Sequence, residues 1–230
     1  MARSTRTYGH FCMLAKTLER VGERWTLLVV RDLASGPRRF TDLMDRLGGI
    51  TPKTLSLRLR TLEEDGLVEV DRQPGRREVW YRLTPAGFDL VPALEELLLW
   101  GLRHAAQPPA PGEATHPEHL LLALRILLER TDVRMTPTHW LLHLTDDGSY
   151  VIAYDGDQWS VEAGAVSDPD IVITTTREAW ARLLTTPPTM RAPDQHGVQI
   201  AGRRQAVSVF MKTIAIFPWG RPASDPSGSP

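Results

Sequence analysis

The chain lacks the features that mark secreted and membrane-spanning proteins. It contains a single cysteine, so no disulfide can form within it. It has no apolar run near the ~18 residues that a membrane-spanning helix needs, and its first residues, MARSTRTYGH, lack the apolar stretch of a signal peptide. We therefore expect a cytoplasmic protein with no membrane partner.

Motifs that carry catalytic chemistry are also scarce. The sequence has no glycine-rich phosphate loop, no cysteine pair, and no serine, histidine and acid in a context that suggests a nucleophile. His139 and His143 have the spacing of two metal ligands on a helix, but their segment predicts a strand, on which positions four apart lie ~13 Å from each other. We expect no enzymatic activity, no metal and no cofactor.

What the chain does have is length and a mild asymmetry of charge. Its 230 residues, of which 42% are hydrophobic, suffice for one large or two small domains with a buried core. Residues 1–104 hold 17 Lys and Arg against 14 Asp and Glu, whereas residues 105–230 hold 10 against 14. The net charge of −1 hides a basic excess in the first part that is too small to establish DNA binding by itself.

The segment Thr51–Gly66 predicts a two-sided helix around which the first part is organised. Thr51 can cap its first turn, Pro52 suits the first helical position, and Gly66 can end it in a left-handed conformation. At about 100° per residue, one stripe is formed by Leu55, Leu59 and Leu62, and the opposite side by Lys53, Leu57, Arg60 and Glu64, flanked by Ser56 and Thr61. Taken alone, the same pattern also fits an ordinary surface helix with solvated charges.

The flanking segments favour a DNA-reading role for this helix. Helices are predicted over Glu23–Ala34 and Thr41–Leu47, and two strands over Leu67–Asp71 and Glu78–Leu83, joined by an arginine-rich turn over residues 72–77. Three helices followed by a hairpin are typical of a winged helix-turn-helix domain, in which the third helix enters the major groove and the wing reaches the backbone. The expected DNA-contacting residues are Arg38, Arg39, Lys53, Thr54, Ser56, Leu57, Arg60, Arg72, Arg76 and Arg77.

Short motifs in this part occur in the order found in a known family. They are Cys12, Glu23-Arg-Trp-Thr-Leu-Leu28, Gly36-Pro-Arg-Arg-Phe40, Gly49-Ile-Thr-Pro-Lys53, Leu57-Arg-Leu-Arg60, Leu62-Glu-Glu-Asp-Gly-Leu-Val68 and Tyr81-Arg-Leu-Thr-Pro85. The segment from Tyr8 to His104 therefore resembles the HxlR-type regulators. The resemblance implies double-stranded DNA as partner and a homodimer held by the helices before and after the core.

The candidate dimer helices are Phe11–Val21 and Pro85–His104, the second of which carries more apolar surface than one small core needs. It can alternatively pack only on its own domain. Cys12 precedes the first helix in an apolar setting and is interpreted as a buried, inert thiol. The family resemblance adds the alternative of a redox sensor.

A second domain is predicted after the proline-rich segment 105–117, which has the composition of an extended linker. It begins with a helix over Glu118–Arg130 and continues with strands over His139–Thr145, Ser149–Tyr154, Gln158–Ala163 and Ile171–Thr175, a helix over Arg177–Leu184, a strand over Gly197–Ala201 and a helix over Arg203–Phe217. Tight turns between the early strands favour a mainly antiparallel sheet. The tail over residues 218–230 is expected to be disordered.

This second part resembles the sterol-carrier-protein-2-like (SCP2-like) domain. The resemblance rests on Asp168-Pro-Asp-Ile-Val-Ile-Thr174, the following helix with Trp180 and Leu184, and Gly197-Val-Gln-Ile-Ala-Gly202. It implies a hydrophobic cavity and a lipophilic or aromatic effector. The residues that would line such a pocket, or would fill a core instead, are Trp140, Trp159, Trp180, Phe210, Met211 and Phe217.

These expectations combine into one architecture and one function. The chain is predicted to be α+β, with a winged helix-turn-helix and dimerisation domain over residues 1–104, a linker over 105–117, an SCP2-like domain over 118–217 and a tail over 218–230. The favoured function is a ligand-responsive dimeric transcription regulator, commonly a repressor, that binds a pseudo-palindromic operator. The alternative is a small-molecule binding or carrier protein whose winged helix contacts proteins.

Overall fold

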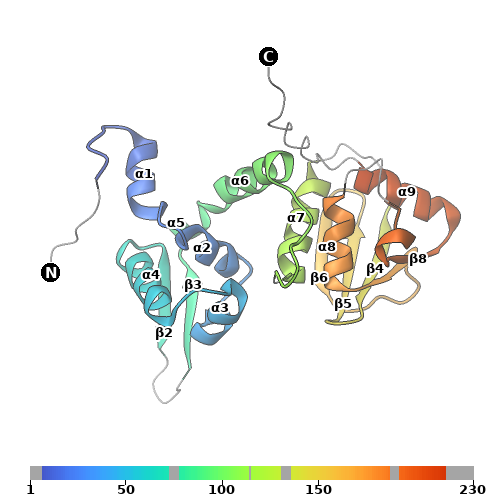
Figure 1. Ribbon diagram of the computed structural model, residues 1–230, viewed down its shortest axis with the longest axis horizontal. Helices are drawn as coiled ribbons and strands as arrows, with labels where there is room; N and C mark the ends of the chain where they lie inside the picture. Colours follow the sequence, from blue (N-terminus) through green and yellow to red (C-terminus); the bar gives the residue numbers. More distant parts are fainter. Residues whose placement is uncertain (1–6, 73–77, 114, 131–135, 187–191, 216–230) are drawn as a thin grey trace. The chain divides into compact units, whose positions relative to one another are not determined.

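The computed structural model describes residues 7–72, 78–113, 115–130, 136–186 and 192–215 (Figure 1). The chain divides into two compact units, residues 1–96 and residues 97–230. This division falls inside the helix α6 (Val91–His104), whereas the sequence predicted the first domain to extend to residue 104. Within the described ranges, no helix combines the length and apolar character needed to cross a membrane.

The first unit contains a bundle of helices and a small sheet. Its helices are α1 (Met13–Val21), α2 (Thr26–Ala34), α3 (Phe40–Leu47), α4 (Pro52–Glu64) and α5 (Pro85–Phe88), and its strands are β1 (Arg38–Arg39), β2 (Val68–Arg72) and β3 (Val79–Leu83). The strand order is β1-β3-β2, with both pairs antiparallel. The three helices and the hairpin that the sequence predicted are therefore present, with β1 as an additional strand.

The core of this unit forms where α2, α3 and α4 meet. Val29 and Leu33 of α2, Leu43 of α3, and Leu55 and Leu62 of α4 have no exposed surface. Burying each such side chain stabilises the fold by about 1.5–3 kcal/mol. The apolar stripe that was predicted for the Thr51–Gly66 helix is thus confirmed, and it fixes which side of α4 faces solvent.

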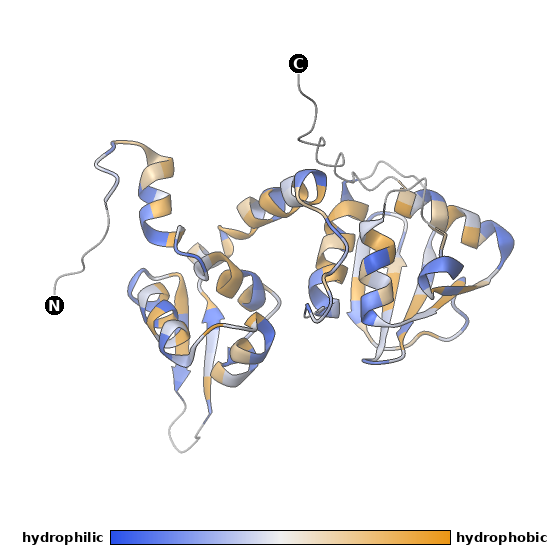
Figure 2. Cartoon of the chain, viewed as in Figure 1, coloured by the Kyte–Doolittle hydropathy of each residue, from blue (hydrophilic) through white to orange (hydrophobic). Residues whose placement is uncertain are grey.

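The predicted helix over residues 85–104 is two helices in the structure, because α5 ends at Phe88 and α6 begins at Val91. Pro92 gives the physical reason: inside a continuous helix it would lack the N–H for a hydrogen bond and its ring would clash with the carbonyl four residues earlier. In the first turn of α6 neither cost arises. Figure 2 shows apolar residues along much of α6, and two of them, Leu97 and Trp100, are 55% and 58% exposed.

The second unit pairs helices with a five-stranded sheet. It contains α7 (Pro117–Glu129), β4 (Thr138–Leu144), β5 (Ser149–Tyr154), β6 (Trp159–Ala163), β7 (Ile171–Thr175), α8 (Arg177–Thr185), the 3₁₀ helix η2 (Asp194–His196), β8 (Gln199–Gly202) and α9 (Arg204–Ala215). The strand order is β6-β5-β4-β7-β8. Three of the four pairings are antiparallel as expected, but β4 and β7 are parallel.

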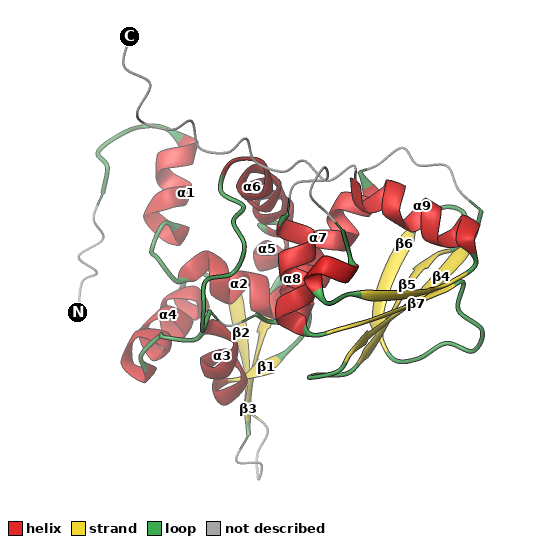
Figure 3. Ribbon diagram, turned by 45° about the vertical axis from the view of Figure 1, so that its right-hand side comes forward, coloured by secondary structure: helices red, strands yellow, loops and turns green. Residues whose placement is uncertain are grey.

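Helices cover one face of this sheet (Figure 3). Along β4 the side chains of Trp140, Leu142 and Leu144 are buried, and they alternate with the exposed His139 and His143. Because successive side chains of a strand point to opposite faces, the buried set lies on the face that the helices cover. The two histidines lie on the other face.

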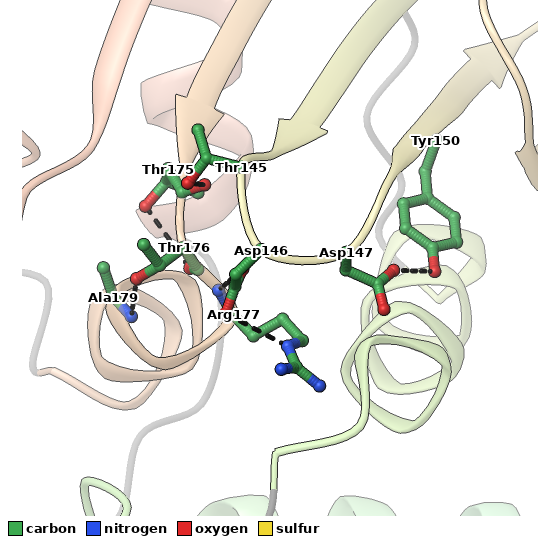
Figure 4. A network of polar contacts seen from close by, with 8 residues as sticks. All are labelled: Thr145, Asp146, Asp147, Tyr150, Thr175, Thr176, Arg177 and Ala179. Atoms are coloured by element: carbon green, nitrogen blue, oxygen red, sulfur yellow. Dashed lines mark hydrogen bonds and ion pairs between the residues drawn. The ribbon is translucent and has the colours of Figure 1, made fainter.

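The turn between β4 and β5 holds the start of α8 (Figure 4). The carboxylate of Asp146 accepts hydrogen bonds from the backbone N–H of Arg177 at 3.0 Å and from its Nε at 3.1 Å. Thr176 caps the same helix by accepting a hydrogen bond from the backbone N–H of Ala179. Asp146 thus places a negative charge beside the positive end of the helix dipole, which fixes the position of α8 on the sheet.

Asp170 joins the beginnings of three elements. Its carboxylate accepts hydrogen bonds from the hydroxyl of Thr138 and the backbone N–H of His139, both at 2.9 Å, and it also contacts the guanidinium of Arg203, which directly precedes α9. The hydrogen bond from the His139 backbone is the main cause that lowers the pKa of Asp170. Gly202 lies so close that a Cβ atom there would be 2.5 Å from the carbonyl oxygen of Asp170, so only glycine fits.

Candidate nucleic-acid interface

The connection between α3 and α4 sets the position of the predicted reading helix. Gly48 and Gly49 have φ values of 49° and 69°, in the left-handed region that favours glycine, and they turn the chain sharply after α3. Ile50 then anchors the turn in the core with 5% exposure. Thr51 accepts a hydrogen bond from the backbone N–H of Thr54 and caps α4, which has Pro52 at its first position. The result is a helix-turn-helix.

The solvent side of α4 carries the residues expected to contact bases. Lys53, Ser56, Leu57 and Arg60 are all exposed, and Leu57 keeps 42% of its surface accessible although it is apolar. Thr54 is half-buried, and its hydroxyl shares a hydrogen bond of 2.8 Å with the Thr51 hydroxyl. Two cations, a hydroxyl and an isobutyl group on one helix face match the donors and apolar surface that a major groove accepts.

The hairpin of β2 and β3 forms the base of the predicted wing. Its register pairs Val68 with Leu83 and Arg72 with Val79. Arg72 is exposed, and its guanidinium lies 3.4 Å from the carboxylate of Glu63 at the end of α4. Arg76 and Arg77, which were also expected to contact DNA, lie outside the described residues.

Arg38 and Arg39 form β1, which pairs with Tyr81 and Trp80 of β3. The guanidinium of Arg38 donates a hydrogen bond to the Ser35 hydroxyl at 3.0 Å, and Arg38 is half-buried. Arg39 is exposed, but its guanidinium is paired with two carboxylates of the same unit.

Three groups surround the Arg39 guanidinium. It binds the carboxylate of Asp42 at 3.0 Å and that of Glu78 at 3.4 Å, and it lies over the ring of Trp80, 5.7 Å from the centroid. The hydrogen bond from Arg39 is the main cause that lowers the pKa of Asp42. These contacts connect the start of α3 to the base of the wing. They could not be predicted from local sequence patterns, because they depend on the pairing of β1 with β3.

A buried carboxylate that the sequence reasoning missed holds α2 against α3. Asp32 has no exposed surface, and it lies 3.2 Å from the Nε of Arg31 and 3.6 Å from the Nε of Arg46. A charge can be buried at this depth only when opposite charges accompany it. Its position within the apolar segment TLLVVRDLA was the available signal.

The aromatic residues considered for ligand binding fill the core of the second unit. Trp140, Trp180 and Phe210 have no exposed surface and Trp159 has 6%. The ring of Trp140 lies 5.0 Å from that of Trp159 and 5.2 Å from that of Phe210, in tilted and edge-on arrangements. Rings packed in this way stabilise a core and leave no room for a ligand among them. Phe217 lies outside the described residues.

Met211 differs from these aromatic residues, because it lines a pocket. The pocket has a volume of about 630 Å³ and lies between η2, β8 and α9. Its described lining consists of Pro193, Asp194, Gly197, Val198, Gln199, Ile200, Val207 and Met211. This volume lies in the range of small-molecule sites.

Cys12 and the helix that follows it are exposed. The thiol was interpreted as buried, but the structure places Cys12 on the surface at the N-terminal cap of α1. Phe11 is 97% exposed, Met13 64% and Leu14 65%, and Val21 is the buried residue of the helix. The apolar setting of Cys12 is thus an apolar surface, which the sequence pattern alone does not distinguish from a core.

Sequence comparisons agree with this winged helix-turn-helix geometry. The HxlR-like helix-turn-helix family model matches residues 20–108. A Mycobacterium tuberculosis protein, Rv3095, described as an uncharacterized HTH-type transcriptional regulator, is 46% identical over 101 residues, which cover 43% of this chain and 62% of that protein. The uncharacterized HTH-type transcriptional regulator YkvN of Bacillus subtilis is 38% identical over 114 residues, which cover 47% of this chain and 95% of YkvN.

A solved structure, the reduced form of the transcriptional regulator YodB from B. subtilis, has 30% sequence identity and a TM-score of 0.36, and it covers 40% of this chain and 92% of that chain. The matched segment spans less than two thirds of the mycobacterial relative's length. The class of protein defined by α3, α4 and the β2–β3 hairpin is the winged helix-turn-helix. Within that class, the chain belongs to the HxlR-like helix-turn-helix family.

Proposed function

We propose that the chain is a transcriptional regulator that binds duplex DNA through α4 in the major groove and through the β2–β3 wing beside it. The exposed face of α4 is the observation that carries this proposal, because its opposite face is anchored in the core by Leu55, Leu59 and Leu62. A rigid helix with a fixed solvent face is what base reading requires. Relatives that are HTH-type transcriptional regulators support the same function.

Within this proposal each residue has a chemical role. The Arg60 guanidinium suits the O6 and N7 atoms of guanine, and Leu57 suits the methyl group of thymine. Lys53, Thr54 and Ser56 supply further contacts near the start of the helix. Arg38, Arg39, Arg72, Arg76 and Arg77 remain predicted backbone contacts, although the internal partners of Arg39 favour an indirect role.

The test compares Arg60→Ala with Arg182→Ala on the operator selected from random DNA by the unaltered protein. Arg182 is an exposed arginine of α8 that pairs with Glu178, so its removal changes the net charge equally. We expect Arg60→Ala to lose roughly 1–3 kcal/mol of binding free energy at the operator and to lose the base preference at one position. Arg182→Ala should bind the operator as the unaltered protein does. Equal losses by Arg60→Ala on operator and random DNA would show that α4 does not read bases.

We also propose that the regulator acts as a homodimer and represses by occluding a promoter. The exposed apolar side chains of Phe11, just before α1, and of Leu14, within it, support a second copy as the partner, since a monomer gains nothing from exposing them. Two linked reading helices strengthen binding that each makes only weakly, and dimers of this class bind half-sites about one helical turn apart, roughly 10 base pairs.

The second unit is proposed to be an SCP2-like effector domain that binds a lipophilic small molecule in the pocket between η2, β8 and α9. The apolar side chains of Val198, Ile200, Val207 and Met211 support this assignment. A ligand changes operator affinity only if it binds one arrangement of the DNA-reading domains more tightly than another. A coupling free energy of about 1–3 kcal/mol would change the operator affinity roughly 5–150-fold. Thermal-shift screening of lipophilic compounds followed by operator titration with each hit tests it.

The same screen separates this function from a carrier protein. Hits that stabilise the full chain and leave operator affinity unchanged would identify a binding or carrier role without regulation. Ligands that fail to bind a Val207→Trp variant, and still bind the unaltered protein, would locate the site in this pocket, because the larger side chain would fill the space beside Met211 without changing the charge of the lining.

A further inference from the structure

The pocket between η2, β8 and α9 contains one formal charge among its described lining residues. Asp194, an exposed residue at the start of η2, supplies a carboxylate, and the remaining described lining consists of apolar side chains, glycine, proline and the amide of Gln199. No lysine, arginine or histidine belongs to that described lining. The described lining therefore combines an apolar wall with a single carboxylate.

The apolar wall comes from two elements that the fold holds together. Val198 is 2% exposed and Ile200 is half-buried, and both lie on the chain that forms β8. Val207 and Met211 are four residues apart on α9 and so lie on one face of that helix. Met211 adapts its shape to irregular ligands, because its side chain is unbranched and its sulfur is polarisable.

The carboxylate allows the pocket to discriminate among lipophilic ligands by their charge, which an apolar wall alone could not do. A fatty acid or another lipophilic anion would bring its charge toward Asp194 and meet like-charge repulsion, and the described lining holds no cation to offset it. A neutral lipid would gain no attraction from the Asp194 carboxylate, which stays in water because Asp194 is exposed. A lipophilic cation would place its apolar groups on Val207 and Met211 and its charge near Asp194.

We propose that this pocket takes a lipophilic cation, such as a hydrophobic amine or an onium compound, with Asp194 as the residue that selects the sign of charge. The proposal rests on the effector role given above to the second unit, and it narrows the class of effector. Because Asp194 is exposed, the attraction is screened by solvent, and selectivity of about fivefold is expected, the upper end for an exposed ion pair.

The test uses two probes of matched shape and opposite charge, tetraphenylphosphonium and tetraphenylborate. Binding of each to the full chain is measured by calorimetry at low ionic strength. The phosphonium is expected to bind the tighter by about fivefold, and this preference is expected to shrink as salt is added, because mobile ions screen exposed charges.

Three variants assign the preference to the pocket. Asp194→Asn keeps the shape and removes the charge, so it should abolish the preference, whereas Gln199→Glu adds a second carboxylate to the lining and should increase it. Asp157→Asn is the matched control, since it removes one carboxylate from the exposed turn before β6, outside the described pocket lining.

The outcomes also separate this inference from the effector role on which it rests. Equal binding of both probes, or a preference that survives in Asp194→Asn, would overturn the inference. The pocket would then remain a proposed effector site that does not discriminate between cationic and anionic ligands. Absence of binding by both probes and by every lipophilic compound would overturn the effector role as well, while DNA binding through α4 would stand on its own test.

Discussion

The carboxylate of Asp32 in α2 lies 3.6 Å from the Nε of Arg46 in α3, and Asp32 has no exposed surface. The Arg46 side chain is itself only 12% exposed. An Asp32→Asn variant would therefore leave buried positive charge with a weaker partner. Removing one member of a buried ion pair costs about 3–5 kcal/mol, so we expect the first unit to unfold at clearly lower urea concentration.

Thermal and urea unfolding of Asp32→Asn and of the unaltered protein, followed by far-ultraviolet circular dichroism, checks this expectation. Asp45→Asn in the same helix as Arg46 is the control, because Asp45 is exposed and its replacement should change stability by less than about 0.5 kcal/mol. Similar stabilities of the two variants would show that the ion pair contributes little to the packing of α2 on α3.

Asp170 predicts how the second unit responds to acid. Hydrogen bonds, first that from the His139 backbone, lower its pKa in the folded protein below the ordinary value of 3.8. A carboxyl group of this kind stabilises the fold at pH values above its unfolded pKa, and the stabilisation is lost as the pH falls through the folded pKa. The stability advantage of the unaltered protein over Asp170→Asn should be complete at pH 7 and should shrink below pH 3.8.

Urea titrations at pH 7, 5 and 3 measure that advantage directly. The exposed Asp157 provides the comparison, since Asp157→Asn should match the unaltered protein at each pH. An advantage over Asp170→Asn that stays constant from pH 7 to pH 3 would contradict the role assigned to the ionised carboxylate.

Arg39 yields a prediction about how the wing base is held. Its guanidinium is shared by Asp42 and Glu78 and lies over Trp80, an arrangement that needs the planar fork of arginine. We expect Arg39→Lys to weaken operator binding as much as Arg39→Ala, with the salt dependence of binding unchanged in both. Operator titrations across a range of salt concentrations provide the measurement.

If Arg39 contacted a DNA phosphate directly, the two variants would behave differently from each other. A lysine also binds phosphate as a point charge, so Arg39→Lys would then bind like the unaltered protein. Arg39→Ala would reduce the salt slope by about one unit, the loss that follows removal of one phosphate contact. That result would return Arg39 to the set of backbone-contacting residues.

The exposed apolar surface of α1 predicts the oligomeric state. Leu14 is 65% exposed, and a Leu14→Glu variant would place a charge in the proposed interface between two copies. We expect light scattering to report a dimer for the unaltered protein and a monomer for Leu14→Glu at micromolar concentration. Leu57→Glu, on an equally apolar exposed position of α4, should remain a dimer and lose operator binding.

Local chemistry allowed most of the first unit to be predicted. The Thr51 cap, Pro52 and Gly66 define the ends of α4, and the leucine spacing defines its buried face, since each signal acts within a few residues. The contacts of Arg39 and the burial of Asp32 could not be predicted, because they depend on which strands and helices become neighbours. The exposure of Cys12 could not be predicted either, because apolar neighbours in the sequence do not show whether another part of the protein covers the thiol.

In the second unit the strand positions were predictable, while the parallel pairing of β4 with β7 was not. Turn signals in a sequence indicate pairing only between strands that follow each other directly along the chain. β4 and β7 are neighbours in the sheet, but β5 and β6 lie between them in the sequence. The pocket beside Met211 likewise arises from η2, β8 and α9 together, so the sequence could suggest Met211 and could not indicate Asp194 as its neighbour.

The central position of β4 also has a consequence for the order in which this unit folds. β4, β5 and β6 can associate through short turns, but β7 must close a long loop to reach β4, as the pairing of Trp140 with Ile171 shows. Closing that loop costs chain entropy before the new contacts compensate it, so β7 and β8 are expected to join late. Until then β4 presents an unpaired apolar edge, which makes the interval before β7 docks the period in which newly made chains are most prone to aggregate.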